Sequence, residues 1–176
     1  MNYMELDTPA LIIDREIMMD NLRFMQDYAD RKKVALRPHT KTHKMPKLAL
    51  IQENLGAKGI TVAKVGEAEV MAAAGLKNIF IANEIVGAVK LARIRKLAES
   101  IDISFGLDSI DQAKMIEAAF EGADKKAQVL IEIEVGEERS GVIEQDDYIK
   151  LLHSLGNGLN AWRHGLHATV ARRFIS

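Results

Sequence analysis

One short run of the sequence gathers most of the side chains that could react with a carbonyl group. Residues 34–44 begin as an apolar stretch typical of a strand and end in a dense cluster of lysines and histidines. Pro38 has no backbone N–H, so it marks the end or the edge of that strand. A deprotonated lysine amine at such a place, above all Lys41, is a nucleophile for an aldehyde or ketone. A basic surface loop before a helix would give the same pattern.

Polar side chains also follow the other apolar stretches that are expected to form strands. Glu132 and Glu134 alternate with apolar residues, so both side chains lie on one face of their strand. Two carboxylates on an inward face need cationic partners, for which Lys41, Lys64 and Arg139 are the candidates. The alternative is that these strand ends turn polar only because they meet water. The full set comprises His39, Lys41, Thr61, Lys64, Asn83, Glu84, Asp108, Glu132 and Glu134.

Arg139 lies between two glycines, Gly136 and Gly141. This pattern suggests a tight loop that aims a guanidinium group at a carboxylate or phosphate, which its planar fork of donors matches well. An exposed arginine in an ordinary turn is the alternative interpretation.

The sequence predicts no metal site. His39 and His43 have a spacing that binds metal on a helix, but His39 ends a strand and no third ligand is nearby. The chain has no cysteine, which excludes disulfides, thiolate nucleophiles and thiolate metal ligands.

The apolar periodicity predicts strands that alternate with helices. A strand at 8–13 and a helix that begins after Asp14 come first. Strict alternation predicts parallel strands joined by helical crossovers. Five units are expected, with the start of a sixth. The later strands are predicted at 34–36, 60–65, 79–82, 101–107 and 129–135, and the later helices at 46–55, 67–74, 88–99, 109–121 and 147–155, the last capped by Asp146.

Two α/β architectures fit this alternation, a doubly wound open sheet and a (β/α) barrel of the TIM type. No glycine-rich phosphate-binding fingerprint follows the first strand, which favours the barrel. In barrels the carboxyl ends of the strands carry the chemistry, and a whole barrel needs about 250 residues. We therefore expect an incomplete barrel of five to six units, preceded by a strand and a helix.

Composition narrows the class of protein. The net charge is −1, from 24 basic and 25 acidic residues, which argues against a nucleic-acid or membrane-surface partner. No apolar run approaches the ~18 residues of a membrane span, and no signal peptide is readable. A soluble cytoplasmic protein is expected.

The run Arg-Pro-His-Thr-Lys-Thr-His-Lys at 37–44 resembles the cofactor-lysine motif of the D-threonine aldolase and D-serine dehydratase group. These are fold-type III pyridoxal phosphate enzymes, related to alanine racemase. Weaker matches follow in the family's order: 8–10, 59–69, and 136–142, which is similar to the family's Gly-x-x-Arg-x-Gly-Val loop. The resemblance covers about residues 8–156.

The resemblance implies a pyridoxal 5'-phosphate enzyme with Lys41 as its Schiff-base lysine and catalytic residue, and with His39 and Arg139 in the cofactor pocket. The implied activity is a lyase, either an aldolase or an ammonia-lyase, acting on a small D-amino acid. It also implies a homodimer at full length and a divalent metal whose ligands this chain lacks. An amino-acid racemase and a non-catalytic cofactor-binding fragment are the alternatives.

The resemblance stops near Leu159. Where the family has a sixth strand and a His-Gly turn, residues 160–167 read Asn-Ala-Trp-Arg-His-Gly-Leu-His. We hypothesise an aberrant ending, such as a frameshift or a truncated gene product. The predicted division is an N-terminal segment at 1–14, a partial barrel at 15–158 and an atypical tail at 159–176.

Overall fold

The computed structural model describes residues 2–136, 138–155 and 159–167, the last of these as backbone only. Its centre is a sheet of five strands in the order β1-β2-β3-β4-β5, and every neighbouring pair is parallel. The order never reverses along the chain, as it would in a doubly wound sheet, so the sheet corresponds to part of a barrel wall. The strands are β1 (Ile60–Val62), β2 (Asn78–Glu84), β3 (Asp102–Leu107), β4 (Ala127–Glu132) and β5 (Leu159–His167).

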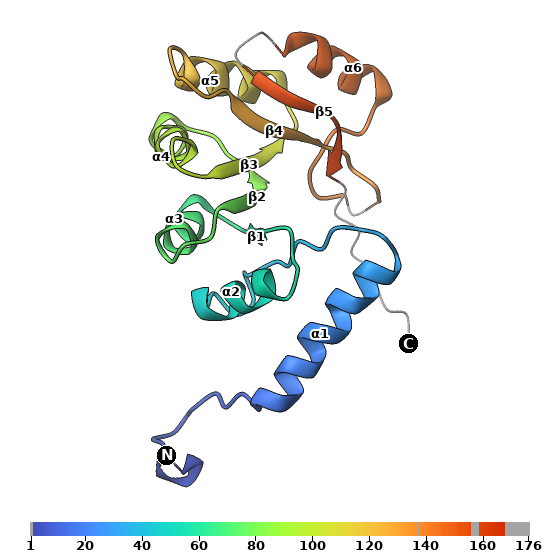
Figure 1. The fold of residues 1–176 in the computed structure, drawn as a ribbon. Helices are drawn as coiled ribbons and strands as arrows, with labels where there is room; N and C mark the ends of the chain where they lie inside the picture. The colour runs from blue at the N-terminus through green and yellow to red at the C-terminus, as the bar shows by residue number, and fades with distance from the viewer. Residues whose placement is uncertain (1, 137, 156–158, 168–176) are drawn as a thin grey trace.

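Helices lie along one side of the curved sheet and connect its strands (Figure 1). Buried apolar rows cross the strands in register, for example Ile60, Ile79 and Ile103. Leu91 and Ile116 pack into the same core from two of the helices. Burial on both strand faces explains why the strands read as continuous apolar runs. The helices are α2 (Pro46–Asn54), α3 (Val65–Ala73), α4 (Ala88–Ala98), α5 (Ile110–Phe120) and α6 (Gln145–Ser154), and α1 (Arg15–Arg31) precedes them.

Local signals set most of the helix boundaries. The Asp14 side chain accepts a hydrogen bond from the N–H of Ile17 at 3.1 Å, which confirms the predicted cap of α1. Ser109 caps α5 in the same way. The predicted cap at Asp146 is wrong: α6 begins after Glu144, and Asp146 lies in the first turn, where the helix dipole still favours its charge.

Two predicted strands do not form. Residues 8–13 are irregular, and Leu11 and Ile12 are exposed, because no neighbouring strand in the described chain supplies a hydrogen-bonded ladder. The stretch at 34–36 is also irregular. The chain just after it still runs beside β1, since the carbonyl of Pro38 accepts from the N–H of Thr61 at 2.8 Å, but only the His39–Thr61 bridge forms. Pro38 cannot donate to a longer ladder.

Two other strands are shorter than predicted. Val65 opens α3 instead of extending β1, because the Glu67 carboxylate turns back and accepts the N–H of Ala63 at 2.8 Å. β4 ends at Glu132 rather than at residue 135, since Ile133 pairs with Val142 of the following loop in an isolated bridge. Both strands thus end where the segment that follows folds back on the sheet.

Part of the predicted atypical tail belongs to the sheet. Residues 159–167 form β5, parallel to β4, with a register shift between Val129 and Ile131. Residues 168–176 lie outside the described residues. The hypothesis of an aberrant ending and the predicted three-segment division stay predictions.

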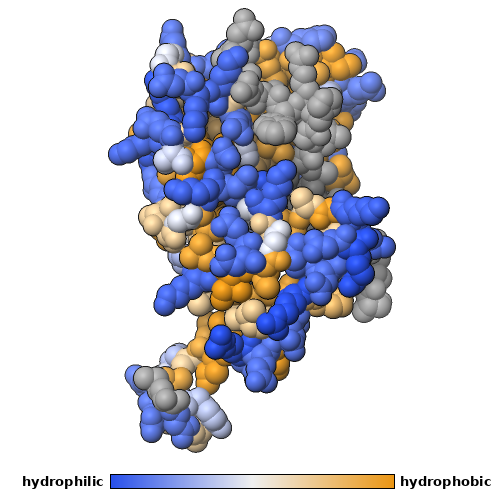
Figure 2. Space-filling view, in the orientation of Figure 1, coloured by the Kyte–Doolittle hydropathy of each residue, from blue (hydrophilic) through white to orange (hydrophobic). Residues whose placement is uncertain are grey.

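The N-terminal arm (residues 2–14) and α1 expose apolar side chains, and Figure 2 shows hydrophobic surface on the stretch that joins the N-terminal end to α1. Leu11 is 102% exposed, Ile17 62% and Phe24 67%. No helix in the described parts of the chain is long and apolar enough to cross a membrane. Contiguous exposed apolar surface of this kind drives association.

We therefore expect the 176-residue chain to self-associate, and expect the double variant Ile17→Ser, Phe24→Ser to shift it towards monomer. Light scattering across a concentration series measures the effect. The control is Val89→Ser, since Val89 is also exposed (77%) but lies on α4, away from the arm. A monomeric parent chain would contradict this prediction.

Candidate active site

The loop that carries Lys41 is anchored by the residues just before it. The N–H of Thr40 donates to the carbonyl of Thr61 at 2.8 Å, and the Thr40 hydroxyl donates to the same oxygen at 3.1 Å. Thr40 is only 1% exposed. The N–H of Lys41 then donates to Nδ1 of His39 at 3.2 Å. These bonds fix the Lys41 backbone at the carboxyl end of the sheet beside β1, while its side chain is exposed.

The three candidate lysines, Lys41, Lys44 and Lys64, differ in their ion pairs and in their place in the secondary structure. Lys44 Nζ lies 3.5 Å from Glu67 Oε1, and the other oxygen of Glu67 accepts the N–H of Ala63, just before α3. Lys64 occupies the N-cap position of α3. Among the described residues, Lys41 Nζ forms no ion pair or side-chain hydrogen bond. Lys41 is thus the one of the three that is neither paired nor built into a helix start.

His43 helps to shape the same loop. Its Nδ1 accepts the N–H of Met45 at 3.0 Å, as His39 Nδ1 does for Lys41. Burial lowers the pKa of His43, and the neighbouring Gln52 side chain opposes that shift. The described residues hold no group of three His, Cys, Asp or Glu side chains that could bind a metal ion. Each of the two histidines thus accepts a backbone N–H of the lysine loop.

A cluster of carboxyl groups lies across the carboxyl ends of β2, β3 and β4. Burial raises the pKa of Glu84 to about 7, and a hydrogen bond with Glu132 and that group's charge add to the shift, while Arg139 opposes it. Burial and the charge of Glu84 also raise the pKa of Asp108. Glu132 is 5% exposed. The sequence marked all three as polar strand ends but did not predict that they meet. The sequence signal for that meeting was Gly106 on β3, between β2 and β4, because a residue without a side chain leaves room there.

Arg139 lies in the tight loop that the flanking glycines predicted. Gly136 and Gly141 both have positive φ angles, +110° and +99°. The hydroxyl of Ser140 donates to Glu132 Oε1 at 2.9 Å, and the N–H of Val142 donates to the Glu132 carbonyl at 2.9 Å. The loop is thus fastened to the end of β4 immediately after Arg139.

The sequence predicted cationic partners for Glu132 and Glu134, and for Glu132 this prediction is wrong. Glu132 accepts a hydrogen bond from Ser140 and interacts with Glu84. The ion pairs of the described residues include none between Glu132 and Lys41, Lys64 or Arg139. The reason is that the carboxyl group of Glu84, rather than a cation, lies next to Glu132. Glu134 lies beyond β4, where its carboxylate accepts the N–H groups of Gly136 and Glu138.

The structure brings some predicted residues together and leaves others apart. His39 and Lys41 share one loop beside β1, whereas Arg139 follows β4 near Glu84. Both groups lie at the carboxyl ends of parallel strands and therefore at one edge of the sheet. No hydrogen bond or ion pair joins Lys41 to Arg139 in the described structure. Their joint role in a cofactor pocket stays a prediction.

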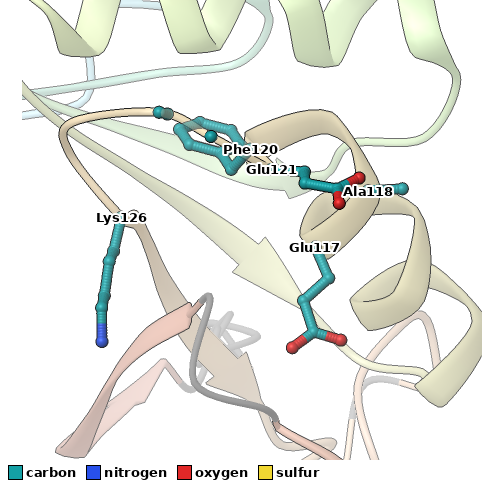
Figure 3. A pocket seen from close by; sticks show the side chains of 7 residues that line it. Glu117, Ala118, Phe120, Glu121 and Lys126 are labelled. Carbon is teal, nitrogen blue, oxygen red and sulfur yellow. The ribbon is translucent and has the colours of Figure 1, made fainter.

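Cavities occur near this edge and away from it. One of about 380 Å³ lies beside the lysine loop, lined by Lys44, Lys64 and α3. A larger cavity of about 430 Å³ lies at the other end of β4 (Figure 3). There Glu117 and Lys126 line a space next to the C-terminus of α5. This second cavity lies before β4 and away from the carboxyl cluster.

Comparisons with known proteins agree with this geometry. The D-threonine aldolase of Arthrobacter sp is 44% identical over 146 residues, which are 83% of this chain and 38% of that protein. The D-threo-3-hydroxyaspartate dehydratase of Delftia sp. (strain HT23) is 36% identical over 155 residues, 88% of this chain and 40% of that protein. The crystal structure of D-threonine aldolase from Filomicrobium marinum matches with a TM-score of 0.83 and 40% identity, covering 87% of this chain and 42% of that one.

The chain thus spans about 40% of the length of the relatives it matches. A family model described as "Alanine racemase, N-terminal domain" matches residues 13–169. This span contains the whole described sheet and both loops of the candidate site. The chain therefore belongs to the alanine racemase N-terminal domain family.

Proposed function

We propose that this chain carries the cofactor lysine of a pyridoxal phosphate-dependent lyase that acts on D-amino acids. The observation that carries the proposal is Lys41: an amine without an ion pair among the described residues, on an anchored loop at the carboxyl edge of a barrel sheet. The similar proteins named as D-threonine aldolase and D-threo-3-hydroxyaspartate dehydratase support the reaction class.

The residues present fit this cofactor. An aldehyde needs a primary amine, and Lys41 supplies one that no described carboxylate holds. An anionic or phenolic oxygen needs a fixed donor, and Arg139 supplies a guanidinium on a loop fastened at Ser140. When bound, pyridoxal phosphate would supply an electron sink for the bond to be broken. The chain's part is then to hold the amine and the cation at one edge of the sheet.

The finer choice between reactions is also part of the proposal. An aldolase breaks the Cα–Cβ bond of a β-hydroxy D-amino acid, whereas a dehydratase removes water from the same substrate class. A D-amino acid with a β-hydroxyl group is therefore the proposed substrate. A homodimer, and a divalent metal bound by residues that this chain does not supply, complete the proposal for longer members of the family.

Two assays test the proposed function. The visible spectrum of the chain with added pyridoxal phosphate separates cofactor binding from no binding. Assays with D-threonine, D-serine and D-alanine, in the presence of the cofactor and a divalent metal, separate aldolase, dehydratase and racemase activities. A longer relative is the reference for turnover. No spectral change with any cofactor concentration would refute the proposal.

Arg139→Ala is expected to weaken pyridoxal phosphate binding by about tenfold or more, because a charge-assisted hydrogen bond contributes about 1.5–3 kcal/mol. Arg139→Lys keeps the charge but loses the planar fork, so only part of the affinity should return. Equilibrium titration measures both variants. Arg31→Ala is the control, since Arg31 is another exposed arginine, in the last turn of α1 and outside the Arg139 loop. Equal effects of Arg139→Ala and Arg31→Ala would show that Arg139 has no special role.

A further inference from the structure

Gly106 lets side chains from two non-adjacent strands meet. It lies on β3, between β2 and β4, and pairs with Glu84 after a register shift. A methyl group at Gly106 would lie 3.2 Å from Glu84 Oε1 and 3.2 Å from the Asn83 carbonyl oxygen. The Glu84 carboxyl group therefore lies directly over the space that a side chain at Gly106 would fill. Across that space it reaches Glu132 of β4.

The hydrogen bonding of the two carboxyl groups is incomplete unless one of them carries a proton. Glu84 Oε1 is buried and has no donor among the described residues, although a buried oxygen normally has one. Glu132 is 5% exposed and accepts a hydrogen bond from the Ser140 hydroxyl. Two ionised carboxylates at hydrogen-bond distance repel each other, whereas one shared proton turns the same contact into a strong hydrogen bond.

We propose that Glu84 and Glu132 share one proton across Gly106, and that this carboxyl pair together with Asp108 positions the loop that carries Arg139. The inference deepens the proposed function, since it concerns that loop, but it makes no use of turnover. Glu84 and Glu132 are positioning residues in this proposal.

The loop contacts carry the second half of the proposal. Ser140 donates to Glu132 Oε1, and the backbone of Gly141 forms a hydrogen bond to Asp108. Arg139 directly precedes both contacts. The loop is thus fastened to carboxyl groups from β3 and β4, with Glu84 between them. A change in their charge acts directly on the anchors of Arg139.

Neutral and charged neighbours define the charge balance. Three charged or titratable groups face Glu84. They are Glu132 on β4, Asp108 at the end of β3, and Arg139 on the loop. From α5, the neutral Gln112 side chain donates to the Gly106 carbonyl at 3.0 Å and accepts the N–H of Asp108 at 3.1 Å. Arg139 is thus the cation that faces Glu84, and it offsets only part of the repulsion among three carboxyl groups.

The pH dependence follows from the sign of the shift. The pKa of Glu84 is raised from 4.5 to about 7, so the folded protein keeps a proton that the unfolded chain has lost. Stability therefore falls as the pH rises between these two values and then levels off. Above about pH 7 the pair carries two charges beside Asp108, and the loop should exchange its amide hydrogens faster.

Infrared spectroscopy of the 176-residue chain tests the shared proton, and it works whether or not the chain associates. We expect the carbonyl stretch of a protonated carboxylic acid at pH 6, lost with a midpoint near 7. Glu84→Gln should remove the band, whereas the control Glu121→Gln, an exposed residue at the opposite end of the sheet, should leave it. Glu132→Gln should move the midpoint to lower pH by roughly one unit, because it removes the neighbouring charge.

Hydrogen exchange of the peptide at 134–142, corrected for the intrinsic pH effect, tests the positioning role. The parent chain should lose protection above pH 7, and Glu84→Gln, which keeps a donor but cannot titrate, should not. Absence of the acid band at pH 6, or a band unchanged in Glu84→Gln, would overturn the shared proton. Loop protection with the same pH dependence in parent and Glu84→Gln would overturn the positioning role. Failure of cofactor binding with an intact band would count against the proposed function alone.

Discussion

Lys41→Ala is expected to abolish borohydride-trapped attachment of pyridoxal phosphate to the chain. The physical reason is that Lys41 is the candidate amine that is neither paired with a carboxylate nor placed at a helix start, in contrast to Lys44 and Lys64. An attacking amine must be deprotonated and able to reach the aldehyde. Mass spectrometry of the reduced protein, followed by peptide mapping, measures the loss.

Three further variants sharpen this test. Lys44→Ala and Lys64→Ala should leave the labelled peptide and its yield unchanged. Lys41→Arg should fail as completely as Lys41→Ala, since a guanidinium keeps the charge but is no nucleophile at neutral pH. A label on Lys44 or Lys64 in the parent protein, with Lys41 unmodified, would refute the assignment.

Gly141→Ala should disrupt the Arg139 loop and reduce cofactor affinity more than any other single methyl group added at this edge. A Cβ at Gly141 would lie 2.6 Å from the Glu134 nitrogen and 2.8 Å from the Ile133 carbonyl carbon, both of them backbone atoms that cannot turn away. The φ angle of +99° adds strain of about 1–3 kcal/mol for a side chain. Calorimetric unfolding and cofactor titration measure the two consequences.

Gly75→Ala is the matched control for that variant. Gly75 has a similar φ angle, +109°, but nothing lies within 4 Å of the added Cβ. It should therefore lose stability through backbone strain alone and bind the cofactor normally. If Gly141→Ala and Gly75→Ala lower the free energy of unfolding equally and both bind the cofactor, the close packing of Gly141 on Glu134 does not affect cofactor binding.

Local patterns predicted much of the fold. The alternation of strands and helices, the parallel order and the cap at Asp14 depend on neighbouring residues, and the structure confirms them. The strands at 8–13 and 34–36 were wrong for a common reason. Strand propensity describes how a segment suits a ladder, but only a partner segment and a free N–H create one.

The candidate site divides in the same way. The lysine run and the glycine-flanked arginine are contiguous motifs, so the sequence alone singled them out. The meeting of Glu84 with Glu132 was not predicted, because it joins residues from strands that are not neighbours in the sheet. It depends on the register of β2 against β3 and on the missing side chain of Gly106. Long-range register is the information that a single sequence carries least.

The ion pair between Lys44 and Glu67 has a consequence for chemical selectivity. Two flexible primary amines three residues apart would compete for the same aldehyde, and a mixture of attachment sites would leave the cofactor in two orientations. Glu67 is itself held in place, because its carboxylate accepts the N–H of Ala63 and its side chain is only 10% exposed. Glu67 thereby occupies the Lys44 amine, so that, under the proposed function, Lys41 is the one of these two amines that a reactive carbonyl at this edge meets unpaired.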